Sequence, residues 1–172
     1  MNLLLTFLVF FHSVLLAQDP GIAELRQLLF KGSQNEEQAD LLFEKVGKYN
    51  GSNALLIGYK GAAHALQAKH SFNPISKLKH IKNAQEYFSE AVAAEPENLE
   101  IRFLRYSVEV QTPAMLDLSE HVSEDQAILL EGLRKYPASN FNAVTAAIAR
   151  DYLLQYCPCS ARDKAFLQAL KL

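Results

Sequence analysis

The stretch AQEYFSEAVAAEPEN, residues 84–98, decides the fold that the sequence predicts. Ala84, Phe88 and Ala91 recur at the spacing of one helical face, and the glutamates fall between them. Small residues around one aromatic ring are typical of a helix that packs closely against a neighbour. Pro96 ends this helix, because proline cannot continue its backbone hydrogen bonds. We therefore interpret the stretch as a packing helix with a hydrated acidic face.

The remaining chain has the apolar spacing of helices and lacks the strict alternation that is typical of strands. We predict one all-α domain of about eight helices, packed as antiparallel pairs, over residues 18–172. The helical intervals are separated by Gly32, Gly51, Pro74, Pro96, Pro113, Pro137 and Pro158. The predicted helices cover residues 22–30, 36–50, 54–70, 74–95, 99–111, 127–136, 141–156 and 162–172, with a short helical turn at 114–118.

Helix 54–70 contains Gly58 and Gly61, although each glycine costs about 1 kcal/mol relative to alanine inside a helix. Ala62 lies four residues after Gly58, so small side chains share one face. We therefore expect a neighbouring helix to touch this face. Replacement of either glycine by leucine should be destabilising.

Capping residues locate several helix starts. Asn53, Asn98 and Ser160 each precede an apolar helical pattern, and their side chains accept hydrogen bonds from the first free N–H groups of a helix. Ser123 is followed three residues later by Gln126, which predicts a capping box and the start of the sixth helix there.

Within residues 84–98, the spacing Ala-x3-Phe-x2-Ala-x4-Pro resembles the second helix of a tetratricopeptide repeat. Upstream, Ile57 and Gly58 resemble the Leu-Gly pair of the first helix of that repeat, while Gly61 stands where a tyrosine is usual. This resemblance implies a right-handed array of antiparallel helix pairs. The connection between the two helices is longer than in the repeat, and no regular 34-residue copy recurs.

A second resemblance covers residues 55–70, 91–116 and 123–129, which look like exported, uncharacterised helical proteins of one group of Gram-negative bacteria. The resemblance implies export and a helical fold, and it implies no particular reaction.

The first 17 residues, MNLLLTFLVFFHSVLLA, contain no Asp, Glu, Lys or Arg and end at a small residue. Their length and composition predict a signal peptide that is cleaved after Ala17. An uncleaved membrane anchor is the alternative, but the apolar run is shorter than the roughly 20 residues of a spanning helix. We predict an exported protein, periplasmic or secreted.

The chain has 17 Lys and Arg residues against 19 Asp and Glu residues, which gives a net charge of -2 and a pI of about 6.2. This balance provides no electrostatic signal for nucleic acid or anionic lipid. We expect no nucleic-acid partner, no membrane contact after cleavage, and a monomer or weak oligomer.

The two cysteines, Cys157 and Cys159, flank Pro158. We expect a bridge between such close neighbours to be difficult to form. The pair should end a helix and pack there, although pairing between chains and free thiols remain alternatives.

The sequence contains no motif for a nucleophile elbow, a phosphate loop, a nucleotide site or a histidine metal pair. We predict no metal and no cofactor. This favours a protein without catalytic activity and does not exclude an enzyme. Glu86 and Glu90 lie four residues apart, which is more typical of a solvated surface than of an acid and base pair. For His64 we likewise expect a structural role.

A binding groove is predicted from Arg102, Arg105 and Glu109, with Tyr59 and Tyr106 lining it. A curved helical array often offers such a concave face, and unpaired guanidinium groups on it would bind carboxylates of a partner. The alternative is that Arg105 and Glu109 form an ordinary ion pair on the surface. The predicted function is an exported binding or scaffold module for a protein or peptide in the cell envelope. The alternatives are a small-ligand-binding protein or enzyme with a pocket between helices, and a structural envelope component.

Overall fold

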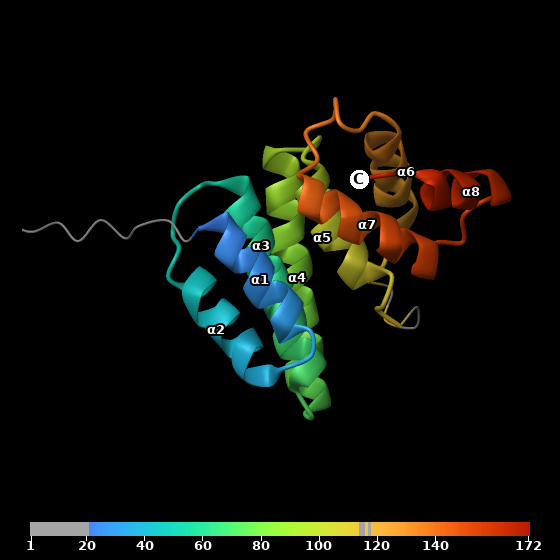
Figure 1. The fold of residues 1–172 in the computed structure, drawn as a ribbon. Helices are drawn as coiled ribbons and strands as arrows, with labels where there is room; N and C mark the ends of the chain where they lie inside the picture. Colours follow the sequence, from blue (N-terminus) through green and yellow to red (C-terminus); the bar gives the residue numbers. More distant parts are fainter. Residues whose placement is uncertain (1–20, 114–115, 117) are drawn as a thin grey trace, which may run out of the picture.

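The structure is a computed structural model that describes residues 21–113, 116 and 118–172. The described residues form eight α-helices and no strand, which confirms the all-α class and the number of helices (Figure 1). The tetratricopeptide-like arrangement of the pairs stays a prediction. The helices are α1 (Ile22–Gly32), α2 (Glu36–Gly47), α3 (Ala54–His70), α4 (Pro74–Ala94), α5 (Leu99–Glu109), α6 (Val122–Arg134), α7 (Ala143–Tyr156) and α8 (Ala161–Ala169).

Most of the helices begin at a polar side chain that accepts hydrogen bonds from the first turn, which confirms the predicted caps of α3, α5 and α8. Five of these residues are asparagines, whose short side chain reaches the free N–H groups of the next two or three residues. The capping residues are Asn35, Asn53, Asn73, Asn98, Asn142 and Ser160.

The antiparallel helices α3 and α4 pack against each other along their small residues, as the sequence predicts. Ala84, Phe88 and Ala91 are fully buried on α4. A Cβ atom at Gly61 would lie 2.8 Å from the ring of Phe88 and 3.0 Å from the carbonyl oxygen of Ala84. The glycine therefore lets the Phe88 ring lie directly on the backbone of α3.

Helix α5 lies at the centre of the molecule, with α1 to α4 on one side and α6 to α8 on the other (Figure 1). It contributes to all three groups of buried apolar side chains. Leu104 joins the group built by α1 to α4, Ile101 joins a small group with Ala91, and Phe103 joins the group built by α5 to α8. Nine of its eleven residues are buried.

Two predicted features lie partly or wholly outside the described residues. The signal peptide, residues 1–17, is one, and the short helical turn at 114–118 is the other. The prediction for the start of α6 is wrong. The helix begins at Val122, so Ser123 lies inside it and forms no capping box. The backbone N–H of His121, the residue directly before α6, donates instead to the Glu109 carboxylate and fixes the chain at the start of this helix.

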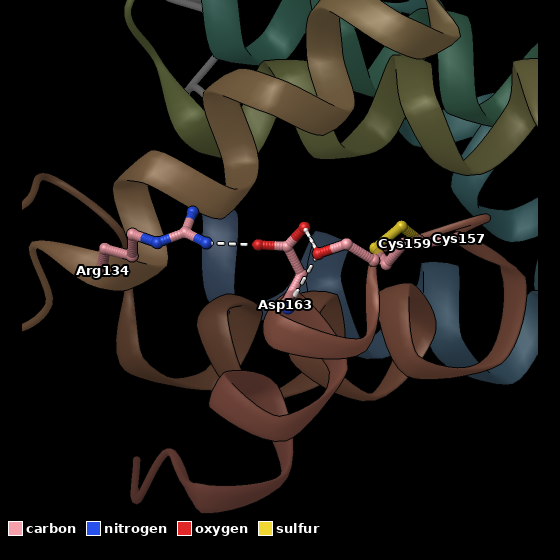
Figure 2. Close-up of a disulfide and its surroundings, with 5 residues drawn as sticks. Arg134, Cys157, Cys159 and Asp163 are labelled. Atoms are coloured by element: carbon pink, nitrogen blue, oxygen red, sulfur yellow. Dashed lines mark hydrogen bonds and ion pairs between the residues drawn. A yellow bond between two sulfur atoms is a disulfide. The ribbon is translucent and has the colours of Figure 1, made fainter.

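The turn between α7 and α8 is closed by a disulfide between Cys157 and Cys159, so the expectation that these thiols would not pair is wrong (Figure 2). The two Cα atoms lie 5.0 Å apart, within the range of ordinary disulfides. Directly after the bridge, Ser160 caps α8 and Asp163 pairs with Arg134 of α6. The bridge therefore lies where α8 is tied to α6.

The two glycines of α3 should respond differently to alanine. We predict that Gly61→Ala destabilises the protein by about 1–3 kcal/mol, because the new methyl group overpacks against Phe88 and the α4 backbone. Gly58→Ala should be neutral or stabilise by up to about 1 kcal/mol, since a Cβ there meets its nearest side-chain atoms at 3.6 Å. Urea unfolding of both variants is the measurement, and equal effects would contradict the described packing.

Candidate functional site

The structure places all five predicted groove residues in the interior, so they do not line an open surface. Tyr59, Arg102, Arg105, Tyr106 and Glu109 are all buried. Both guanidinium groups have carboxylate partners within the chain, so neither is available to a partner's carboxylate. Four of them instead belong to three polar contacts that surround α5, and Tyr106 belongs to none.

The largest of these contacts joins α5 to α6 through Asp125, which is fully buried. Arg105 donates two hydrogen bonds to its carboxylate, from Nε and Nη2, each 2.7 Å long. Arg102 adds a third from Nη1 at 2.9 Å and also reaches Glu124 at 2.8 Å. Burial alone would lower the pKa of Arg102, but the hydrogen bonds to Asp125 and Glu124 outweigh it and raise the pKa.

A second contact joins α5 to α1 and α3 through Glu100. Arg26 donates to its two oxygens at 2.9 and 2.6 Å, in the bidentate geometry that suits a guanidinium and a carboxylate. The hydroxyl of Tyr59 donates to the same carboxylate at 2.7 Å. Burial and the charge of Glu100 raise the pKa of Tyr59 well above its ordinary value, so the hydroxyl remains a donor.

The third contact ties the end of α5 to the segment before α6. Glu109 accepts from the backbone N–H of His121 at 2.8 Å, and its other oxygen lies 2.9 Å from His121 Nδ1. The hydroxyl of Ser119 donates to the Glu109 carbonyl. The alternative prediction of a surface pair between Arg105 and Glu109 is therefore wrong, because each residue binds a partner near α6.

The hydroxyl of Tyr106 is the exception among these polar groups. It is buried and has no hydrogen-bond partner among the described residues. Its ring lies edge-on to Tyr152 with centroids 6.3 Å apart, within the apolar group of α5 to α8. Burial raises the pKa of Tyr106, which keeps the hydroxyl neutral. We interpret Tyr106 as a packing residue.

His64 and His80 form a separate polar pair between α3 and α4, with their Nδ1 atoms 2.9 Å apart. This hydrogen bond needs one ring nitrogen that carries the hydrogen and one that is bare, so at least one of the two rings is neutral. Burial, helped by the charges of His80, Lys60 and Lys79, lowers the pKa of His64 to about 4. The adjacent hollow of about 50 Å³ is lined by Phe43, Val46, Gly47, Lys60, His64 and Tyr87. That volume holds a few water molecules and no substrate.

An open groove runs between the start of α5, α6 and the segment that follows α6, and we call it the α5–α6 groove. Its volume is about 530 Å³. Leu99 and Gly132 are buried and form its bottom. Ser139 is also a lining residue, and its hydroxyl is buried without a hydrogen-bond partner among the described residues. The lining residues are Glu97, Leu99, Ala127, Ile128, Glu131, Gly132, Lys135, Ser139 and Asn140.

The closeness of α6 to α5 at this groove depends on Gly132, where a Cβ atom would lie 2.5 Å from Leu99. Glu131 and Lys135 form an exposed ion pair on the rim, 3.2 Å apart. Such an exposed pair contributes little to stability. Glu131 and Lys135 can therefore separate, and each can pair with a charged group of a ligand instead.

Within residues 21–113, 116 and 118–172, no cluster of three or more His, Cys, Asp or Glu side chains has the proximity that a metal site needs. In the same residues, no helix combines the length and the apolar composition required to cross a bilayer.

The sequence pattern did not indicate several residues of these sites. Asp125 and Glu124 have the pattern of ordinary acidic residues in a first helical turn, and Glu100 has the same position in α5. Ser139 lies in a segment without helical spacing. The polar stripe of Arg102, Arg105 and Glu109 on α5 was the one available signal, but an exposed helix has the same pattern, so it did not indicate burial.

No protein-family profile, curated protein or solved structure matches the chain. The resemblances to the tetratricopeptide repeat and to the exported helical proteins therefore stay predictions.

Removal of the buried carboxylate of Asp125 should lower the free energy of unfolding far more than removal of the exposed carboxylate of Glu124. We predict that Asp125→Ala destabilises the protein by about 3–5 kcal/mol, because it leaves Arg102 and Arg105 buried without their main partner. Glu124→Ala is the matched control, since Glu124 binds the same arginines but is 53% exposed, and should cost at most about 1 kcal/mol. Urea unfolding compares the two, and similar losses would contradict the network described here.

Acid should destabilise the protein through His64. An unfolded histidine titrates near 6.5, and the pKa of folded His64 is about 4, so the unfolded chain binds more protons between these values. The contribution of His64 is therefore complete above pH 6.5 and decreases as the pH falls toward 4. We expect His64→Gln to reduce the loss of stability between about pH 7 and 5. An NMR titration midpoint of His64 near 6.5 would refute this.

Proposed function

We propose that the protein is an exported helical binding module that holds a segment of another protein in the α5–α6 groove. The single observation behind this proposal is the groove itself, an open depression of about 530 Å³ with an apolar bottom and a charged rim. A volume of this size lies in the range of ligand sites.

The lining of the groove favours a protein segment as the ligand. Protein interfaces combine a buried apolar centre with a polar rim, and Leu99 at the bottom with Glu131 and Lys135 on the rim follow that pattern. The depression is open to solvent, so a side chain that projects from a partner's surface can enter it.

The surroundings of the groove suit a preformed binding site. Helices α5 and α6 are held together by the three hydrogen bonds to Asp125, and α6 is tied to α8 through Arg134 and Asp163. A groove between helices that are fixed in this way loses little conformational freedom when a ligand binds.

The proposed location is outside the cytoplasm, in the periplasm or beyond the cell. Two observations support it: the apolar leader of residues 1–17 in the sequence, and the disulfide between Cys157 and Cys159. Disulfides persist in oxidising compartments and are rare in the cytosol.

Site-specific photocross-linking tests the binding part of the proposal. We expect p-benzoylphenylalanine in place of Ala127, on the exposed rim, to yield a discrete covalent adduct with an envelope protein. The same group in place of Ala169, which is exposed on α8, is the control and should yield none. The adduct should disappear when the rim is altered by Lys135→Glu, because the charge there is reversed.

Equal cross-linking from positions 127 and 169, or none from either, would overturn the binding proposal. The export proposal is tested separately, since the recovered chain should begin at Gln18. An intact Met1 on protein from the cytoplasm would refute export and leave the groove assignment to the cross-linking result.

A further inference from the structure

The turn between α3 and α4 exposes apolar side chains that nothing in the described chain covers. Phe72 is 99% exposed, Ile75 is 82% exposed and Leu78 is 38% exposed. Ile75 and Leu78 lie three residues apart on α4, so they share one face, and Phe72 precedes them in the turn. Single exposed apolar residues are common, but a contiguous group at the end of a hairpin marks a contact surface. We call residues 69–82 the α3–α4 tip.

The same tip is strongly basic. Lys69, Lys77, Lys79 and Lys82 are all exposed, and none of them forms an ion pair within the part of the chain that the structure describes. The sequence contains no Asp or Glu between Glu44 and Glu86. The net charge of -2 for the whole chain therefore conceals a local excess of positive charge.

The tip projects from the body of the molecule. In Figure 1 the α3–α4 turn forms the lower end of the molecule, beyond the end of α2. Helix α2 packs along α3, and its Asp40 accepts a hydrogen bond from Gln67, one turn before the tip. Helix α4 carries three of the four lysines and has no acidic residue in its first turn.

We propose that the α3–α4 tip docks on the surface of an anionic lipid bilayer. The headgroup region of such a bilayer attracts clustered lysines, and the boundary below it accepts apolar side chains to a depth of about 5–10 Å. Phe72 and Ile75 protrude, as insertion requires, whereas a protein partner would need a complementary pocket. Lys79 lies four residues after Ile75, and Lys82 four after Leu78, so charges flank the apolar stripe.

This inference goes beyond the proposed function and uses no residue of the α5–α6 groove. It also departs from the prediction of no membrane contact, which was based on the charge of the whole chain. Docking of this kind is peripheral, since the tip lies on the lipid surface and spans nothing.

The experiment uses the absence of tryptophan from the sequence. In the full chain, Phe72→Trp introduces a single tryptophan, whose emission, excited selectively over that of the seven tyrosines, reports on position 72. With vesicles of phosphatidylcholine and about one third phosphatidylglycerol, its emission should shift to the blue. Pure phosphatidylcholine vesicles should produce no shift. Phe30→Trp is the matched control, because Phe30 is 64% exposed on α1, and it should not shift with either vesicle.

Two further variants, made in the Phe72→Trp chain, separate the contribution of the lysine charges from that of apolar insertion. Lys77→Gln with Lys79→Gln should weaken the partition into anionic vesicles about 30-fold, and a rise in salt from about 0.05 to 0.5 M should do the same or more. Ile75→Ser should weaken it about tenfold through lost apolar burial. Lys164→Gln with Lys171→Gln, on and after α8, is the charge control and should have no effect.

Lipid docking is overturned if Phe72→Trp shows no shift with anionic vesicles, or if Phe30→Trp shifts equally. It is also overturned if the lysine pair can be replaced without effect. A shift with soluble polyaspartate but not with vesicles would assign the tip to an acidic protein. None of these outcomes affects the cross-linking test of the α5–α6 groove, because the two surfaces share no residue.

Discussion

The salt bridge between Asp125 and the two arginines of α5 is the interaction on which the structure depends. Helix α5 contacts helices on both sides, so its polar stripe has no route to solvent. A buried guanidinium group is tolerated only where carboxylates neutralise it and satisfy its N–H groups. Asp125 does this for Arg102 and Arg105 with three hydrogen bonds, and α6 must lie at one fixed position along α5 for that geometry to form.

The polar contacts around α5 therefore select one arrangement of the helices. Apolar packing alone tolerates small shifts along a helix, whereas a bidentate pair such as Arg26 with Glu100 does not. Because these charged groups bind one another, ligand binding is left to surfaces outside the network. The α5–α6 groove and the α3–α4 tip are two such surfaces, and they lie in different halves of the molecule.

The fold was largely predictable because it is encoded by local patterns. Helical spacing, capping asparagines and the small residues facing Phe88 act within a few positions of the chain, and the structure confirms them. The site was not predictable, because burial of Arg102 and Arg105 depends on a helix about 20 residues further along. An amphipathic helix on a surface and a central helix with a neutralised polar stripe have the same pattern. The groove and the tip likewise depend on which helices leave a face uncovered, and the spacing of residues within one helix does not determine this.

Helix α5 contributes to each of the three buried apolar groups, and this affects how the protein unfolds. Leu104, Ile101 and Phe103 anchor three different groups from a single helix. Neither the α1 to α4 half nor the α6 to α8 half can open fully without exposing a side of α5. The slowest-exchanging amide hydrogens should therefore be those of α5, which are released only when the whole chain unfolds, while the outer helices α2 and α8 exchange through smaller local openings.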